Sequence, residues 1–201
     1  MTAVRAEVIG TWRLLLLPLR TAHAEEMAVV LSDPALYTFI GGAPPTPGEL
    51  RSRYARWVAG SPDPAVSWCN WVVASRADGC LTGTLQATVG GRGRNAADTG
   101  SSEDTDGTVG GGDHVAEISW VVGTPWQGRG IATEAARGLV AWLGRQPVRD
   151  VVAHVHPEHH ASAAVAAAAG LTSTGCLHEG EAGWRLTLRG GGARDASTGP
   201  F

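Results

Sequence analysis

Hydrophobic and polar positions follow two periods along the chain, and together they predict a protein of mixed helix and strand. Short β-branched and apolar segments predict seven strands, over residues 12–19, 67–75, 80–89, 116–122, 148–155, 172–178 and 183–188. Apolar residues spaced three and four apart predict helices over 21–31, 47–58, 132–143 and 161–169. We therefore expect a single α+β domain, with helices on both faces of a central mixed sheet.

Local signals set several element ends. Thr46 is placed to cap a helix that starts at Pro47, and Glu49 completes a capping box. Asp78 and Gly79 indicate a hairpin between two strands. Gly170 is placed to end the last helix.

The segment 90–113 has a different composition from its surroundings, being rich in Gly, Ser, Thr and Asp and nearly free of apolar residues. We predict a flexible insertion in a hairpin connection, with a functional lid as the alternative. The tail 190–201 is predicted to be disordered. The folded domain is then expected over residues 12–189.

Composition narrows the class of protein. The 201 residues carry a net charge of −3, which is too small to indicate nucleic acid or an anionic membrane as a partner. The apolar run 14–17 is too short to span a membrane and makes a poor signal segment. Three cysteines without CxxC spacing do not suggest a disulfide framework. We expect a cytoplasmic enzyme.

The segment 114–145 reads as a strand, a glycine-rich turn and a helix, a combination that suits an anion. A helix that starts directly from such a turn presents unpaired N–H groups and the positive end of its dipole. The glycines at 128 and 130 do not complete a dinucleotide fingerprint. All 16 basic residues are arginine, so a P-loop lysine and a Schiff-base lysine are excluded.

Two motifs carry a resemblance to a known family. Residues 127–132, Gln-Gly-Arg-Gly-Ile-Ala, resemble the Q/R-x-x-G-x-G/A signature of the GNAT superfamily of N-acetyltransferases. Residues 157–171 resemble its second motif, although His159 stands where the family has asparagine. The segment 13–20 resembles the branch that acetylates ribosomal-protein N-termini. The resemblance implies the GNAT fold, whose mostly antiparallel mixed sheet splays open between strands four and five.

The same resemblance implies the cofactor and its ligands. Acetyl-CoA would serve as the acyl donor, with its pyrophosphate on the loop amides and its pantetheine arm in the opening of the sheet. The cofactor-binding residues are then expected to be Val121, Val122, Gln127, Gly128, Arg129, Gly130, Ile131, Ala132, Thr133, His159 and Ser162. The backbone N–H of Val121 is also the expected donor to the oxyanion.

Glu117 is the candidate general base, because a carboxylate in the strand beside the cleft can take a proton from an amine. The alternative is an ordinary strand residue or an ion-pair partner. The general acid is harder to place, since Ala166 occupies the position of the tyrosine that many family members use. Ser162 is the nearest hydroxyl, and it could protonate the thiolate, bind pantetheine or cap the helix.

Four histidines, at 154, 156, 159 and 160, lie close together in the sequence. Imidazoles in such a group could hold zinc or nickel. No cysteine, aspartate or further strand ligand accompanies them at a recognised spacing, so we expect no metal.

The sequence therefore predicts an N-acetyltransferase that moves acetyl from acetyl-CoA to a primary amine by direct attack in a ternary complex. The acceptor, a small molecule or a protein N-terminus, would be bound by residues 37–57 and the loops. The alternatives are a non-catalytic acyl-CoA sensor module and an enzyme that uses a larger acyl group such as succinyl. Either a monomer or a homodimer is expected.

Overall fold

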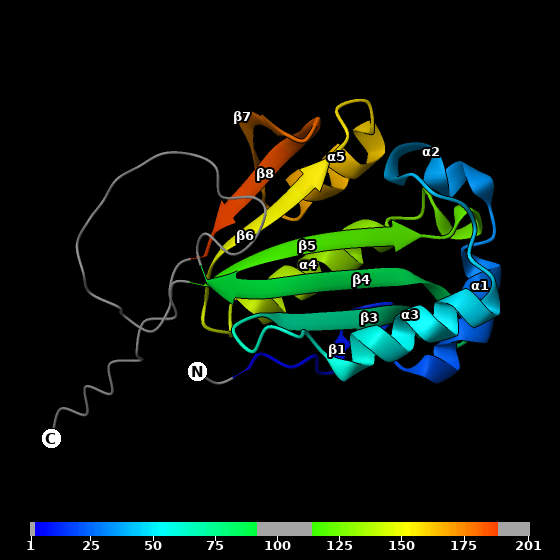
Figure 1. The fold of residues 1–201 in the computed structure, drawn as a ribbon. Helices are drawn as coiled ribbons and strands as arrows, with labels where there is room; N and C mark the ends of the chain where they lie inside the picture. Colours follow the sequence, from blue (N-terminus) through cyan, green and yellow to red (C-terminus); the bar gives the residue numbers. More distant parts are fainter. Residues whose placement is uncertain (1–2, 92–113, 189–201) are drawn as a thin grey trace, which may run out of the picture.

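The computed structural model describes residues 3–91 and 114–188, which form one eight-stranded sheet flanked by helices (Figure 1). The strand order is β1-β2-β3-β4-β5-β6-β8-β7, and only β5 and β6 pair in parallel within the described residues. The strands are β1 (Ile9–Gly10), β2 (Leu14–Pro18), β3 (Ser67–Ser75), β4 (Leu81–Gly91), β5 (His114–Val122), β6 (Val148–Val155), β7 (Thr172–His178) and β8 (Glu181–Thr187). The predicted α+β class with a mostly antiparallel sheet is confirmed.

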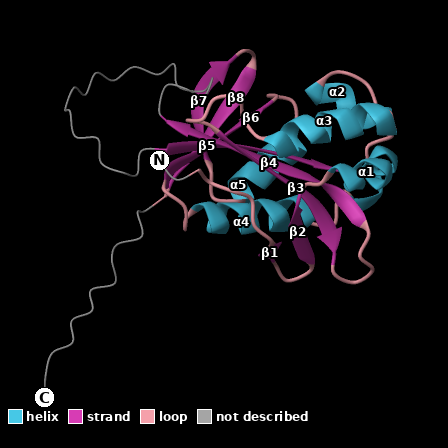
Figure 2. Ribbon diagram, turned by 60° about the horizontal axis from the view of Figure 1, so that its bottom comes forward, coloured by secondary structure: helices cyan, strands magenta, loops and turns pink. Residues whose placement is uncertain are grey.

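Helices cover both faces of the sheet, as Figure 2 shows. The α-helices are α1 (Ala24–Val30), α2 (Tyr37–Ile40), α3 (Pro47–Ala59), α4 (Ile131–Leu143) and α5 (His160–Ala168). Short 3₁₀ helices lie at Thr21–His23, Pro34–Leu36 and Thr124–Trp126. We call the side covered by α4 and α5 the α4 face, and the side covered by α1 and α3 the α3 face.

Each face has its own core. On the α4 face, Ala135, Ala136 and Leu139 are fully buried, and the rings of Trp71 and Trp142 meet edge to face at 5.2 Å. On the α3 face, Met27, Leu50 and Tyr54 pack against the alternate residues of β3, Val72 and Ala74. The sheet thus separates two packed layers, as the alternation in its strands predicts.

Several element boundaries differ from those expected. The predicted strand 12–19 corresponds to the shorter β2, Leu14–Pro18, which pairs with a strand that was not predicted, β1 at Ile9–Gly10. The chain reverses between them, where Thr11 N–H donates to Leu14 O at 3.0 Å. Residues 37–40, where no helix was expected, form α2. Strand β4 continues through Gly90 and Gly91, which pair with β5. Of the predicted insertion, residues 92–113 lie outside the described residues, as does the predicted tail 190–201.

The parallel pair β5–β6 opens part-way along its length. Their register runs from His114 opposite Val148 to Glu117 opposite Val152 and goes no further. Beyond that point β6 stays paired with β8 as far as Val155. The two strands diverge visibly in Figure 1, so the splay expected between the fourth and fifth predicted strands is present at β5 and β6.

Candidate functional site

The loop before α4 presents its backbone to solvent. Gly128 and Gly130 have φ of 72° and 74°, a left-handed conformation that glycine adopts without penalty. Gly130 is the N-cap residue, and the N–H of Glu134 makes its hydrogen bond to Gly130 O at 3.0 Å. The amides of residues 131–133 come before that bond and therefore have no hydrogen-bond acceptor within the helix. A Cβ at Gly128 would meet nothing within 4 Å, so this surface is open to an anion.

The β1–β2 turn clamps this loop. Oε1 of Glu134 accepts hydrogen bonds from Thr11 Oγ1 at 2.6 Å and Arg13 N at 2.7 Å, while Oε2 accepts one from Arg13 Nε at 2.7 Å. Arg13 Nη1 then donates to Arg129 O at 3.0 Å. Burial raises the pKa of Glu134, but these hydrogen bonds outweigh it and hold the pKa below its usual value. The carboxylate therefore fixes the start of α4.

Gln127 also braces the loop. Its side-chain Nε2 donates to Val122 O at 3.0 Å, across the short helix Thr124–Trp126. This contact ties the loop to the end of β5. In this structure the Gln127 side-chain amide nitrogen binds protein backbone, while its predicted contact with the cofactor stays a prediction.

Glu117 lies at the point where β5 and β6 part. It belongs to the last residue pair between them, and its Oε1 lies 3.2 Å from His154 Nδ1. The Glu117 side chain is 35% exposed, whereas that of His154 is 12% exposed. A half-exposed carboxylate held by an imidazole can accept a proton from a bound ligand.

Glu117 and His154 line a cleft of 530 Å³ that we call the acidic cleft. The other residues in its lining are Phe39, His156, His178, Glu179, Gly180 and Glu181. Among the described residues, its lining contains three carboxylates and no arginine. The cleft therefore attracts cations.

The remaining predicted site residues lie on β5 and at the start of α5, on either side of the opening between β5 and β6. Val121 and Val122 lie on β5 beyond its last pair with β6. His159 precedes α5 and stacks on Phe39 with ring centroids 4.4 Å apart. Burial and then the neighbouring His156 lower the pKa of His159. Ser162 lies half-buried in the first turn of α5 and lines neither the acidic cleft nor the cavity described next.

A second cavity, of 140 Å³, lies between the α3 face of the sheet and the N-terminal helices; we call it the inner cavity. Its floor includes a row of paired residues across three strands, Asn70 opposite Gln86 and Gln86 opposite Ser119. The other lining residues are Leu19, Leu31, Tyr37, Ile40, Leu50, Arg53, Tyr54, Trp57, Trp71, Thr84, Leu85, Trp120 and Val121. Sequence reasoning placed the acceptor near 37–57 but missed this floor.

Helix α2 lies between the two spaces. Tyr37 and Ile40 line the inner cavity, and Phe39 lines the acidic cleft. Tyr37 Oη donates to Leu31 O at 3.0 Å, which holds the helix over the sheet. Three of the four residues of α2 therefore line one or the other of the two spaces.

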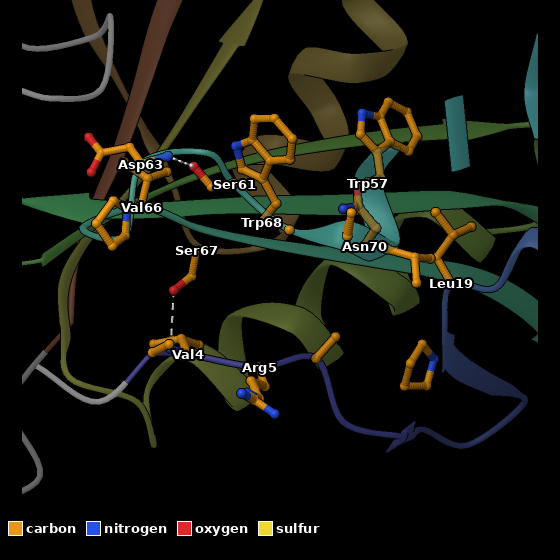
Figure 3. A pocket seen from close by; sticks show the side chains of 17 residues that line it. Val4, Arg5, Leu19, Trp57, Ser61, Asp63, Val66, Ser67, Trp68 and Asn70 are labelled. Atoms are coloured by element: carbon orange, nitrogen blue, oxygen red, sulfur yellow. Dashed lines mark hydrogen bonds between the residues drawn. The ribbon is translucent and has the colours of Figure 1, made fainter. Parts of the chain in front are cut away.

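A third and larger space, of 580 Å³, lies at the edge of the α3 face (Figure 3). The N-terminal segment borders it, where Val4 N–H donates to Ser67 Oγ at 3.1 Å. It shares Leu19, Trp57 and Asn70 with the inner cavity, and none of the predicted catalytic or cofactor residues lines it. We call it the N-terminal groove.

Within the described ranges 3–91 and 114–188, no group of three or more His, Cys, Asp or Glu side chains is arranged to hold a metal ion. Three of the four histidines contact other partners instead: His154 meets Glu117, and His156 and His159 meet Phe39. No helix in the same ranges is both long and apolar enough to cross a membrane.

Comparison with known proteins agrees with this geometry. A family model described as an acetyltransferase (GNAT) domain matches residues 13–172. Among curated proteins, no sequence match was found.

Solved structures share the fold at low sequence identity. A GNAT-family acetyltransferase from Bacillus anthracis is 18% identical with a TM-score of 0.65, covering 90% of this chain and 99% of its own. RimL, a ribosomal L7/L12 α-N-protein acetyltransferase solved with coenzyme A, is 16% identical with a TM-score of 0.67, covering 90% and 98%. AAC(6')-Ib, solved with paromomycin and acetyl-CoA, is 18% identical with a TM-score of 0.64, covering 88% and 94%.

Proposed function

Because the chain belongs to the GNAT acetyltransferases, we propose that it transfers acetyl from acetyl-CoA to a primary amine by direct attack within a ternary complex. The observation that carries the proposal is the opening between β5 and β6, which has Glu117 at one end and leads to the open loop before α4 at the other. The acyl donor, acetyl-CoA, and the base, Glu117, would thus lie along the same strand, β5.

The unpaired part of β5 suits the pantetheine arm. From Glu117 to Val122 the strand extends about 17 Å, five residues at about 3.4 Å each. Beyond Glu117, its edge towards β6 has no strand partner among residues 3–91 and 114–188. An extended ligand that carries amide groups can hydrogen-bond such an edge as an added strand would. The pyrophosphate would then reach the amides near Gly128–Thr133, with Gly130 allowing close approach.

Glu117 would act as the base. The carboxylate takes a proton from the acceptor ammonium, directly or through a water. The neutral amine nitrogen then attacks the thioester carbonyl carbon, and the N–H of Val121 would stabilise the oxyanion. Collapse of the intermediate breaks the C–S bond, and the surplus proton of the attacking nitrogen passes through water to the departing thiolate. Ser162, in the first turn of α5, is proposed as a pantetheine contact, as is His159.

The charge of the acidic cleft supports an amine acceptor. Glu179 and Glu181 from the β7–β8 turn face the same space as Glu117, so an ammonium group is drawn toward the base. Among the similar structures, RimL is a ribosomal L7/L12 α-N-protein acetyltransferase, and AAC(6')-Ib was solved with paromomycin and acetyl-CoA. Both kinds of acceptor are compatible with an open cleft.

The test is a transfer assay on the full chain. Acetyl-CoA is mixed with a panel of primary amines that includes diamines, amino-acid amides and short peptides; released thiol and the mass of the amine product are measured. We expect thiol release that depends on the amine, with one acetyl group added. Acetyl-CoA binding without transfer to any amine would instead identify a sensor module. Faster transfer from succinyl-CoA would overturn the acetyl preference.

A further inference from the structure

The inner cavity has polar groups in an otherwise apolar enclosure. Asn70 is 6% exposed and Tyr54 is 1% exposed, and both line the cavity. Among the described residues, neither polar atom of the Asn70 amide has a hydrogen-bond partner, and the Tyr54 hydroxyl has none either. Burying such a group without a partner costs roughly 1–3 kcal/mol. The folded protein has this unfavourable free energy at both Asn70 and Tyr54, which line the same small cavity.

Asn70 lies at the boundary between the inner cavity and the N-terminal groove. In Figure 3 its side chain lies between Trp57 of α3 and Leu19. Those three residues separate the inner cavity from the N-terminal groove. Leu19 N–H donates to the backbone O of Asn70 at 2.9 Å, so the main chain there is satisfied and only the side-chain amide lacks a partner. A ligand group in the inner cavity is therefore placed to complete its hydrogen bonds.

The inner cavity adjoins the proposed reaction centre. Ser119, at the end of its polar row, lies two residues beyond Glu117, so both side chains face the same side of β5 about 7 Å apart. Ser119 is exposed, which leaves this end of the cavity open. Asn70 lies two strands away from Ser119, about 10 Å at about 4.8 Å per strand, so an acceptor with its amine at Glu117 reaches Asn70 through a chain of several bonds over Ser119 and Gln86.

The lining also sets the charge and size of that group. Of the described residues that form it, Arg53 is the only charged one and none is a carboxylate, in contrast to the acidic cleft. A second ammonium is therefore unfavourable there. The Asn70 amide offers both a donor and an acceptor. Burial raises the pKa of Tyr54 to about 12, so its hydroxyl stays protonated and able to donate. The volume of 140 Å³ is below the roughly 300–1,000 Å³ of pockets that hold a whole drug-sized ligand.

We propose that the inner cavity selects a primary-amine acceptor that carries a neutral hydrogen-bonding group, a hydroxyl or a carboxamide, several bonds away from the amine, bound by Asn70 and Tyr54. This inference rests on the proposed acetyl transfer and names its acceptor class. Asn70 and Tyr54 are then specificity-determining residues. Polar sites of this kind discriminate strongly, because an acceptor of equal shape that lacks the polar group leaves the protein groups unpaired.

The test uses pairs of acceptors of similar shape. 5-Aminopentan-1-ol is compared with hexylamine, and 6-aminohexanamide with 6-methylheptylamine; the tripeptides Gly-Thr-Gly and Gly-Asn-Gly are then compared with Gly-Val-Gly and Gly-Leu-Gly, to separate a small amine from a peptide N-terminus. For wild-type enzyme we expect kcat/KM to be at least tenfold higher for the polar member of each pair. Whichever of the two series is faster identifies the source of the acceptor.

Two variants assign the preference to the cavity. Asn70→Leu removes the amide at similar size, and Tyr54→Phe removes only the hydroxyl; each is expected to lower the ratio between paired acceptors towards one, mainly by reducing kcat/KM for the polar member. Thr82→Val is the matched control, since Thr82 is fully buried, donates to Val73 O at 3.1 Å and lines none of the three spaces. Its ratio should equal that of wild type.

Each outcome decides between the two proposals. Transfer to amines with equal kcat/KM within every pair would overturn the inference and leave the acetyltransferase proposal standing. So would a preference for acceptors with a carboxylate in this position, which would assign the cavity to Arg53. A ratio that survives in both Asn70→Leu and Tyr54→Phe would also overturn it. Transfer to no amine at all would overturn both.

Discussion

The two sides of β4 differ although they belong to the same strand. Leu85, Ala87 and Val89 point to the α4 face and are 0–3% exposed. Thr84, Gln86 and Thr88 point the other way and are half-buried. One side is closed by α4 and has apolar residues only, whereas the other forms part of the floor of the inner cavity and bears hydroxyl and amide groups.

The two faces are thus proposed to have different roles: the α4 face positions the cofactor, and the α3 face selects the acceptor. The α4 face holds the helix whose N-terminus would bind the cofactor, and close packing there fixes the position of that terminus. The α3 face is hollow next to Glu117, and its polar groups are available to an acceptor. Substitutions on the two faces should therefore have different effects on catalysis, cofactor affinity and stability, and the following experiments measure that difference.

The largest effect is expected at Glu117, on the α3 face. Glu117→Gln keeps the size of the side chain but removes the base, so kcat should fall by about 10²–10⁴ with little change in the KM for acetyl-CoA. Higher pH should restore part of the rate, because more of the amine arrives neutral. Glu181→Gln is the matched control, as it removes another carboxylate of the same cleft and should act mainly on the acceptor KM. Wild-type kcat with an unchanged pH profile in Glu117→Gln would contradict the assignment.

The next effect concerns the loop that the α4 face supports. Gly130→Val adds a β-branched side chain at a φ of 74° and covers backbone amides, so acetyl-CoA affinity measured by calorimetry should fall about tenfold or more. Gly175→Val is the control for backbone strain: its φ is 73° and a Cβ there meets nothing within 4 Å. It should leave the affinity unchanged. Equal affinity in a folded Gly130→Val protein would place the cofactor elsewhere.

The smallest effect tests the packing contrast itself. Ala136→Leu, at a site with no exposed surface on α4, should lower the free energy of unfolding by about 1–3 kcal/mol through overpacking. Thr84→Leu adds a similar volume on the cavity side, where space exists, and should change stability by less than about 1 kcal/mol. Urea unfolding of both variants gives the comparison. A larger loss in Thr84→Leu would show that the cavity wall cannot accept the added volume.

The sequence predicted best those structural features that a few neighbouring residues determine. The loop at Gly128 and Gly130 needs left-handed backbone, which leaves a visible pair of glycines, and the capping box of Thr46 with Glu49 is confirmed at the start of α3. The family expectation from residues 127–132 is likewise confirmed. These features are local, so neighbouring residues reveal them.

The inner cavity left no such signal. Asn70, Gln86 and Ser119 lie on three strands, and only the register of the sheet brings them into one row. Helix α2 is four residues long, too short for a helical period to be read. The catalytic and cofactor roles assigned to Glu117, Val121 and Ser162 remain predictions for the experiments above.

The position of α2 has a consequence for how acceptor choice can change. Because Tyr37, Phe39 and Ile40 face two different spaces, substitutions within four consecutive residues reshape both of them. The loop before α4 and the clamp of Thr11, Arg13 and Glu134 lie on other elements. Exchanging this one segment between relatives is thus a compact route by which evolution, or an engineer, can redirect the enzyme to new amines while its acyl donor stays the same.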